Sequence, residues 1–254
     1  GPKGTGKLVL AREIARSLLC AAAENRPGCK ECQGCYLFDA GNHPDYHFLT
    51  NEQTVEAGDL ALVASGERYL VQTNGRSNYR VKPKRVIGVN QVRALTEELR
   101  STPHYAVGKV VVIYPADELN VNAANALLKV LEEPTPETHF LLVTSALYAL
   151  PATVRSRCSH YRLPLPNGDV ALTWLRGKLS LDREESKQLL DFANGSPLEA
   201  YKLFEEKETW LSGASLPTEL AAILAGDTTP TIISKKWSQT DIRMTVRWLQ
   251  QQMV

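Results

Sequence analysis

The sequence has little net charge, no long apolar run and no recognisable secretory signal, and each of these absences argues against one class of function. Its net charge is only +1 over 254 residues, so the overall charge does not favour nucleic-acid binding, which would need a local patch. No apolar run approaches the roughly 20 residues that a membrane helix needs, which excludes a membrane-spanning protein. No secretory signal is recognisable. What remains is an ordinary globular composition, with 43% hydrophobic residues, and a length that fits two or three domains.

The first eight residues, "GPKGTGKL", follow most of a phosphate-binding loop motif. Gly1, Gly6 and Lys7 match G-x-x-x-x-G-K, in which backbone N–H groups bind phosphate at a helix N-terminus and the lysine reaches the terminal phosphates. Apolar residues at helical spacing predict that helix over about residues 7–20. Leu8 stands where the motif has a hydroxyl for Mg²⁺, so phosphoryl transfer would lack one of its usual parts. By itself, such a loop is as often a vestige as a working site.

The two ends of the sequence both look interrupted. The chain begins without Met, directly at a loop of a kind that normally follows a strand. It ends within the helical pattern "DIRMTVRWLQQQMV", with no helix stop signal. We therefore expect a fragment of a longer chain, without the first strand of its fold.

Two runs of β-branched and aromatic residues predict strands that are buried on both faces. They are "KVVVIY", residues 109–114, and "HFLLVT", residues 139–144. The helical pattern "NAANALLKVLEEP" between them gives the strand–helix–strand order of a parallel sheet. A shorter run at residues 47–50 is a further candidate strand. We therefore predict an α/β fold for about the first 165 residues, followed from Pro166 onward by helical patterns.

A hydrolytic nucleotide site also needs two acidic residues at the end of a central strand, one for the metal and one to position water. The strand "KVVVIY" instead ends in Tyr114-Pro115. Asp117 and Glu118 follow closely, and we expect them beyond the strand end, in the next turn. They remain candidates for replacing the missing pair.

Four of the five cysteines form the most specific chemical signal in the sequence. Cys20, Cys29, Cys32 and Cys35 have the spacing C-x8-C-x2-C-x2-C, and four thiolates can complete the tetrahedral shell of a zinc ion. A clustered set within an odd total argues against disulfides. Because protein would fill all four positions, the predicted zinc site is structural rather than catalytic. Cys158 stands apart, and we expect it to be a small buried apolar residue.

Several other residues allow two interpretations. His43 and His47 could bind metal, but the cysteine set is complete without them, which favours loop or packing roles. Arg155, Arg157 and Arg162 could stabilise phosphate charge in a neighbouring subunit's site, or they could pair with surface carboxylates. From the residues alone, surface pairing is favoured.

A basic segment at residues 66–85 contains Asn74-Gly75, which predicts a tight turn between two β-like runs and hence an inserted hairpin. A solvated basic loop is favoured over contact with a nucleic-acid backbone. The basic residues in question are Arg76, Arg80, Lys82, Lys84 and Arg85.

Four blocks in order give the chain its clearest resemblance. They are the phosphate-binding loop, the four-cysteine module, "NALLKVLEEP" at residues 125–134 and "SRC" at residues 156–158. Through these blocks the sequence resembles the clamp-loader AAA+ proteins of bacterial DNA polymerase III, and the resemblance covers nearly the whole chain. Departures from the ATP-hydrolysing members each remove a different contact, to metal, water or phosphate, and they lie at Leu8, at Tyr114-Pro115 and at Leu198, which replaces a sensor arginine.

The resemblance implies a subunit that does not hydrolyse ATP itself and whose Gly1, Gly6 and Lys7 form a vestigial loop. Arg157 matches the family's arginine finger, which acts on ATP held by the adjacent subunit, so this interpretation replaces surface pairing. The resemblance also implies a cytoplasmic component of the DNA-directed DNA polymerase holoenzyme. Its partners would be gamma/tau and delta subunits in a hetero-pentameric ring, which opens the sliding clamp and places it on primed DNA.

For the domains, the resemblance implies an AAA+ α/β domain at residues 1–164, with a zinc module at about residues 20–35. A helical lid at residues 165–210 and the start of a helical collar at residues 211–254 would follow. The segment at about residues 54–85 is longer than the family leads us to expect, and we assign it no role.

Two alternatives stay open. One is an ATP-hydrolysing gamma/tau-type subunit that uses Lys7 with Asp117 or Glu118. The other is a zinc-stabilised nucleic-acid-binding protein that uses the basic segment, and its affinity for DNA would fall steeply with salt.

Overall fold

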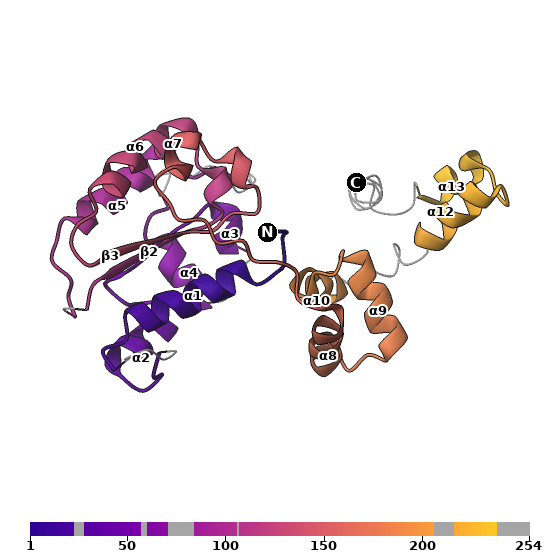
Figure 1. Ribbon diagram of the computed structural model, residues 1–254, viewed down its shortest axis with the longest axis horizontal. Coiled ribbons are helices and arrows are strands. Elements are labelled where there is room, and N and C mark those ends of the chain that lie inside the picture. The colour runs from indigo at the N-terminus through magenta and orange to yellow at the C-terminus, as the bar shows by residue number, and fades with distance from the viewer. Residues whose placement is uncertain (23–27, 57–59, 71–83, 106, 206–215, 238–254) are drawn as a thin grey trace, which may run out of the picture. The chain divides into compact units, whose positions relative to one another are not determined.

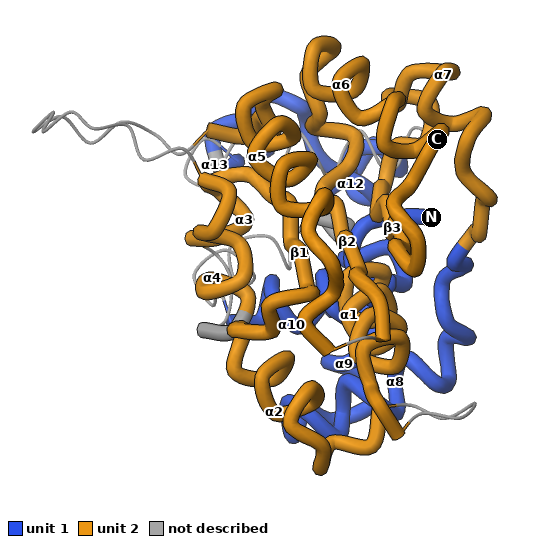
Figure 2. The backbone as a smooth tube through the Cα atoms, turned by 90° about the vertical axis from the view of Figure 1, so that its left-hand side faces the viewer, with its two compact units in different colours: residues 1–6, 163–254 blue, residues 7–162 orange. Residues whose placement is uncertain are grey.

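The computed structural model divides the chain into two compact units, shown in orange and blue in Figure 2. The α/β unit comprises residues 7–162, and the helical unit comprises residues 163–254 together with residues 1–6. The sequence placed this boundary at residue 164 and assigned the first six residues to the α/β domain, whereas the structure groups them with the helices. The structure describes residues 1–22, 28–56, 60–70, 84–105, 107–205 and 216–237.

In the residues that the structure describes, the α/β unit is built on a parallel sheet of three strands. These are β1 (Tyr46–Leu49), β2 (Lys109–Ile113) and β3 (Thr138–Leu142), in the order β1-β2-β3. Both pairs are parallel, which confirms the strand–helix–strand prediction. β1 and β2 are buried along their whole length. The expectation of a fully buried β3 is wrong, because helices α4 and α5 cover β1 while β3 packs mainly against β2.

Helices and short turns surround this sheet. Those described in the α/β unit are α1 (Lys7–Leu18), α2 (Gln33–Asp39), α3 (Glu52–Glu56), α4 (Leu60–Glu67), α5 (Val89–Leu99), η1 (Ala116–Glu118), α6 (Val121–Glu132), η2 (Leu147–Ala149) and α7 (Ala152–Arg155). α1 confirms the helix that was predicted after the glycine-rich loop.

The side chains of β2 alternate between the two faces of the sheet, as the two-residue period of a strand requires. Val111 and Ile113 lie in one apolar cluster with residues of α5 and α6. Val110 and Val112 lie in a second apolar cluster with residues of α1, α2 and α4. Figure 1 shows the three layers that result, with α5 and α6 on one side of the sheet and α1 and α4 on the other.

The long segment at about residues 54–85 is largely helical where the structure describes it. Residues 66 and 67 form the end of α4, and Tyr69 is buried, so the predicted hairpin is wrong for its first residues. The predicted turn at Asn74-Gly75 and most of the basic residues lie outside the described residues.

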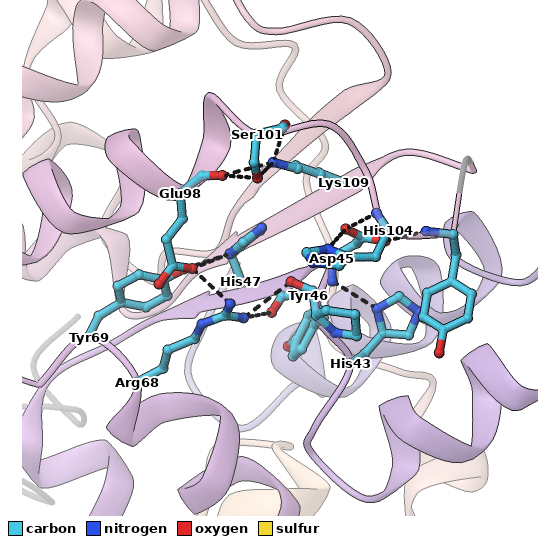
Figure 3. Close-up of polar contacts among 12 residues, drawn as sticks. His43, Asp45, Tyr46, His47, Arg68, Tyr69, Glu98, Ser101, His104 and Lys109 are labelled. Atoms are coloured by element: carbon cyan, nitrogen blue, oxygen red, sulfur yellow. Dashed lines mark hydrogen bonds and ion pairs between the residues drawn. The ribbon is translucent and has the colours of Figure 1, made fainter.

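A polar network ties this segment to the sheet (Figure 3). The Tyr69 hydroxyl donates to Glu98 Oε2 over 2.6 Å and lies 2.6 Å from His47 Nδ1 in β1. Because that hydroxyl has one proton to give, His47 Nδ1 is the donor in the second contact. Arg68 forms an ion pair with the same Glu98 carboxylate at 2.9 Å. His47 therefore has a packing role, as the sequence favoured.

Lys109 is buried at the start of β2, where its charge needs partners. Its Nζ donates to the backbone carbonyls of Glu98 and Ser101 over 2.8 and 2.6 Å (Figure 3). Carbonyls at the C-terminal end of a helix have no partner within the helix, so Lys109 caps the end of α5 and joins it to the sheet.

The helical unit confirms the helical patterns predicted after Pro166. Helix α9 begins with a capping box between Asp182 and Glu185, and Leu175 and Leu189 are fully buried at the centre of the cluster formed by α8, α9 and α10. No helix in the described part of the chain is long and apolar enough to cross a membrane. The described helices of this unit are α8 (Gly168–Leu179), α9 (Arg183–Phe192), α10 (Pro197–Glu205), α12 (Leu216–Ala225) and α13 (Pro230–Trp237).

Candidate functional site

The glycine-rich loop at the start of the chain packs closely against the first turn of α10, within the helical unit. Ser196 Oγ donates to the Lys3 carbonyl over 2.7 Å, and the Leu198 amide donates to the Gly4 carbonyl over 3.3 Å. Gly4 has φ +71°, and a Cβ atom there would lie 2.3 Å from Ser196 Oγ. Both the backbone conformation and the close contact therefore require glycine at this position.

The other loop residues named by the motif lie on either side of the unit boundary. Gly1 and Gly6 belong to the helical unit, and Lys7 begins α1 in the α/β unit. A Cβ atom on Gly1 would lie 2.2 Å from the Leu163 carbonyl oxygen, and Gly6 has φ +84°. The local geometry thus accounts for both glycines without a ligand.

Leu8 and Tyr114 stand at two positions where the sequence departs from the ATP-hydrolysing pattern, and both make apolar contacts. Leu8, in the first turn of α1, packs against the cluster that contains Val112. Tyr114, directly after β2, packs against the same cluster. Mg²⁺ is bound by oxygen ligands, most often carboxylates. Neither residue supplies a carboxylate, and both pack against apolar side chains.

Asp117 and Glu118 lie beyond the end of β2 in the short turn η1, which confirms the expectation from the sequence. Asp117 Oδ1 accepts hydrogen bonds from Thr144 Oγ1 over 2.6 Å and from the backbone amide of residue 145 over 3.3 Å. Glu118 Oε2 accepts a hydrogen bond from the Asn51 side-chain amide. Both carboxylates therefore hold neighbouring loops together.

Arg157 lies just after α7, with its guanidinium between two acceptors. Nε donates to Glu132 Oε1 over 2.7 Å, and Nη2 forms an ion pair with the same oxygen. Nη1 donates to the Thr153 carbonyl over 2.7 Å. The side chain of Arg157 is 33% exposed. The structure therefore holds this arginine at the surface in a fixed orientation.

The two neighbouring arginines differ from Arg157. The Arg155 guanidinium lies over the Tyr148 ring, 5.1 Å from its centroid, and Arg162 is exposed. The sequence did not single out Glu132 as a partner for any arginine. The sequence did contain a signal for such a partner. Glu132 ends α6, where the negative end of the helix dipole disfavours a carboxylate unless a positive side chain pairs with it.

Cys20, Cys29, Cys32 and Cys35 come together into one cluster, in which all four sulfur atoms lie within 4.8 Å of one another. The Sγ atoms of Cys20 and Cys32 are 3.9 Å apart, and those of Cys29 and Cys35 are 4.0 Å apart. A tetrahedral ion with Zn–S bonds of about 2.3 Å requires sulfur pairs about 3.8 Å apart. The donor set and its spacing therefore fit a metal ion of this type.

Three of these sulfurs accept hydrogen bonds from backbone amides, which stabilise the thiolate form. The amides of Cys29, Cys32 and Cys35 donate to the sulfurs of Cys20, Cys29 and Cys32, over 3.3 to 3.4 Å. Hydrogen bonds from the amides of Glu31 and Cys32 lower the pKa of Cys29 to about 6. Burial raises the pKa of Cys35 to about 12, which a bound cation would offset. Cys158 stands apart from the cluster, and burial raises its pKa.

His43 has a packing role, as the sequence favoured. It is buried, and its Nδ1 accepts a hydrogen bond from the Asp45 amide over 3.1 Å. Burial lowers the pKa of His43, so the ring is neutral at pH 7.

The parallel sheet with helices packed on both of its faces defines a protein of the α/β class, in which Leu8 and Tyr114 pack against one apolar cluster. Residues 1–167 match the family described as "DNA polymerase III, delta subunit". The chain belongs to that family.

Individual relatives agree with the family match. The DNA polymerase III subunit delta' of Pseudomonas aeruginosa is 36% identical over 204 residues, which cover 80% of this chain and 53% of the relative. The subunit delta' of Escherichia coli (strain K12) is 32% identical over 247 residues, which cover 97% and 64%. The DNA polymerase III subunit gamma of Buchnera aphidicola subsp. Schizaphis graminum is 28% identical over 210 residues, which cover 81% and 49%. The chain thus spans about half the length of the curated relatives it matches.

Proposed function

We propose that the chain is a non-hydrolysing clamp-loader subunit of DNA polymerase III that supplies Arg157 to the ATP site of a neighbouring subunit. In this role it joins gamma/tau and delta subunits in a cytoplasmic hetero-pentameric ring, which loads the sliding clamp onto primed DNA. Its α/β unit acts as the AAA+ domain, α8 to α10 as the lid, and the helices that follow as the start of the collar. The observation that carries the proposal is the contrast between an apolar nucleotide site and an exposed, oriented arginine.

The nucleotide site supports the absence of hydrolysis. Leu8 and Tyr114 pack against the apolar cluster below them, so no metal ligand stands at either position. Asp117 and Glu118, the candidates for a replacement pair, already accept hydrogen bonds from neighbouring loops. Freeing either carboxylate would leave those donors without their partners. These contacts weigh against the alternative of a gamma/tau-type ATPase.

The cysteine cluster supports a structural zinc ion. Cys20, Cys29, Cys32 and Cys35 would hold the metal, and its chemistry there would be to cross-link the segments before and within α2. Four protein ligands leave no open position for substrate or water. The alternative of a nucleic-acid-binding protein depends on basic residues that lie largely outside the described part of the chain.

The arginine proposal is tested by Arg157→Ala in the full-length protein, assembled with its gamma and delta partners. Turnover of ATP at the adjoining site should fall, because an arginine finger contributes about 10³ to 10⁵ in comparable phosphoryl-transfer systems. Arg162→Ala, which removes a nearby exposed arginine, serves as the matched control. Unchanged turnover in an assembled Arg157→Ala complex would reject the finger.

The absence of hydrolysis is tested by titrating Mg-ATP into the full-length protein in a calorimeter, with Lys7→Ala as the comparison. We expect little or no binding heat and no turnover by the protein alone. Tight binding that strengthens with magnesium and disappears in Lys7→Ala would instead support the gamma/tau-type ATPase.

A further inference from the structure

Glu132 and Arg157 come from two different elements that the fold brings together. Glu132 is the last residue of α6, and Arg157 follows the short helix α7. Oε1 of the carboxylate contacts both Nε, at 2.7 Å, and Nη2, so a single oxygen lies against the Nε–Nη2 edge of the guanidinium. The Thr153 carbonyl accepts from Nη1 at 2.7 Å.

These contacts use three of the donors of the guanidinium and leave two. An arginine carries five N–H donors in a planar fork. Nε and one N–H of Nη2 face Glu132, and one N–H of Nη1 faces the Thr153 carbonyl. Nη1 is also 3.4 Å from Ser156 Oγ, which is long for a hydrogen bond. One N–H of Nη1 and one N–H of Nη2 are therefore not used by these contacts and can be offered to phosphate oxygens.

The Glu132 side chain is expected to contribute little to the stability of the fold. Its side chain is 48% exposed, and exposed ion pairs contribute little to stability. It also lies at the negative end of the α6 dipole, which opposes a carboxylate. The adjacent Glu133 is exposed too, but among the described residues the carboxylate that pairs with Arg157 is that of Glu132. The pairing is therefore specific to Glu132.

We propose that Glu132 is a positioning residue, which holds the Arg157 guanidinium so that its two remaining N–H donors face the phosphate of the neighbouring subunit. Glu132 itself touches neither nucleotide nor metal and acts through the arginine. The inference rests on the proposed function, because it requires Arg157 to act in trans.

The test compares Glu132→Ala, Glu132→Gln and Glu133→Ala in the assembled full-length complex, with Arg157→Ala and the double variant Glu132→Ala/Arg157→Ala. Glutamine keeps an oxygen that can accept from Nε and Nη2, whereas alanine removes it. Glu132→Ala should therefore lower kcat by roughly tenfold, within the about 10²-fold that a misplacement of 1 Å can cost. Glu132→Gln should retain most of the activity, and Glu133→Ala should be unchanged.

The KM for ATP should stay constant in Glu132→Ala, because a finger acts on the transition state rather than on ground-state binding. The double variant should be no slower than Arg157→Ala, since Glu132 has no effect once the arginine is gone. Losses that multiply in the double variant would show an independent structural effect and overturn the proposal.

Two further outcomes separate the inference from the function it rests on. Normal turnover in Glu132→Ala, together with low turnover in Arg157→Ala, would reject the positioning role and leave the finger intact. Normal turnover in Arg157→Ala would reject the finger itself. A rise in turnover in both Glu132 variants would show that the carboxylate restrains the arginine, which also overturns the proposal.

Discussion

Acidification from pH 7 to pH 5 should destabilise the α/β unit through the buried imidazole of His47. Burial, with the positive charges of Arg68 and Lys109, lowers the pKa of His47 from 6.5 to about 3. The native state therefore keeps this ring neutral, while the unfolded chain binds a proton below about pH 6.5. The contribution to stability is complete above pH 6.5 and is lost progressively as the pH falls toward 3.

The size of the effect follows from that pKa difference. Each pH unit inside the window costs about 1.4 kcal/mol, so the 1.5 units between pH 6.5 and pH 5 cost about 2 kcal/mol. Burial lowers the pKa of His43 as well, which adds a loss of the same sign. The pKa of Asp45 is also lowered: burial opposes this change, but hydrogen bonds from the backbone amide and ring of His104 and from the Tyr105 amide outweigh burial. Its contribution is lost only as the pH falls below the ordinary value of 3.8, outside this range.

The assay is urea denaturation of the wild-type chain and of His47→Gln at pH 7, 6 and 5. Glutamine does not titrate, so the variant should lose about 2 kcal/mol less than wild type between pH 7 and pH 5. His139→Gln, at an exposed position in β3, is the matched control and should behave as wild type. Acid also releases metal from thiolates, but both proteins share that effect and the difference between them removes it. Equal losses in wild type and His47→Gln would refute the reasoning.

Three other perturbations test separate parts of the structure. Cys29→Ser should lower the zinc content from about one ion per chain and reduce the Tm, while Cys158→Ser, outside the cluster, should keep the metal; full stability without metal would contradict the zinc proposal. Gly4→Ala should destabilise the helical unit by about 1 to 3 kcal/mol, because alanine is strained at φ +71° and meets Ser196 Oγ, and thermal denaturation would measure the loss. Leu175→Ala should cost about 2 to 5 kcal/mol and lower hydrogen-exchange protection in α8 to α10 without changing that of β2, since the two units have separate cores; equal losses in both units would argue against that separation.

Local patterns were enough to predict much of the fold and part of the candidate site. The apolar spacing after Lys7 and the run at residues 109–114 gave a helix and a buried strand, because side-chain period and burial are coupled within a single element. The pattern between residues 109 and 142 gave parallel pairing, since short strand–helix–strand connections leave few other topologies. The cysteine cluster followed from its spacing, because x2 intervals place sulfurs on one tight turn.

Interactions between distant segments could not be predicted in the same way. The exposure of β3 depends on which helices cover the sheet, and the helical course of residues 66 and 67 depends on the packing of Tyr69 and Arg68 against Glu98. Nothing in the local sequence around these residues encodes a partner some 30 positions away.

By itself, then, the sequence determined the α/β and helical elements, the missing polar ligands at Leu8 and Tyr114, and the four clustered cysteines. Only the tertiary structure decided that Leu8 and Tyr114 pack against one apolar cluster, that Gly4 fits against Ser196, and that Glu132 pairs with Arg157. The physical reason is the range of the forces involved. Helix and strand periods act over a few residues, whereas these contacts form only when the folded chain has brought separate elements within hydrogen-bonding or van der Waals distance.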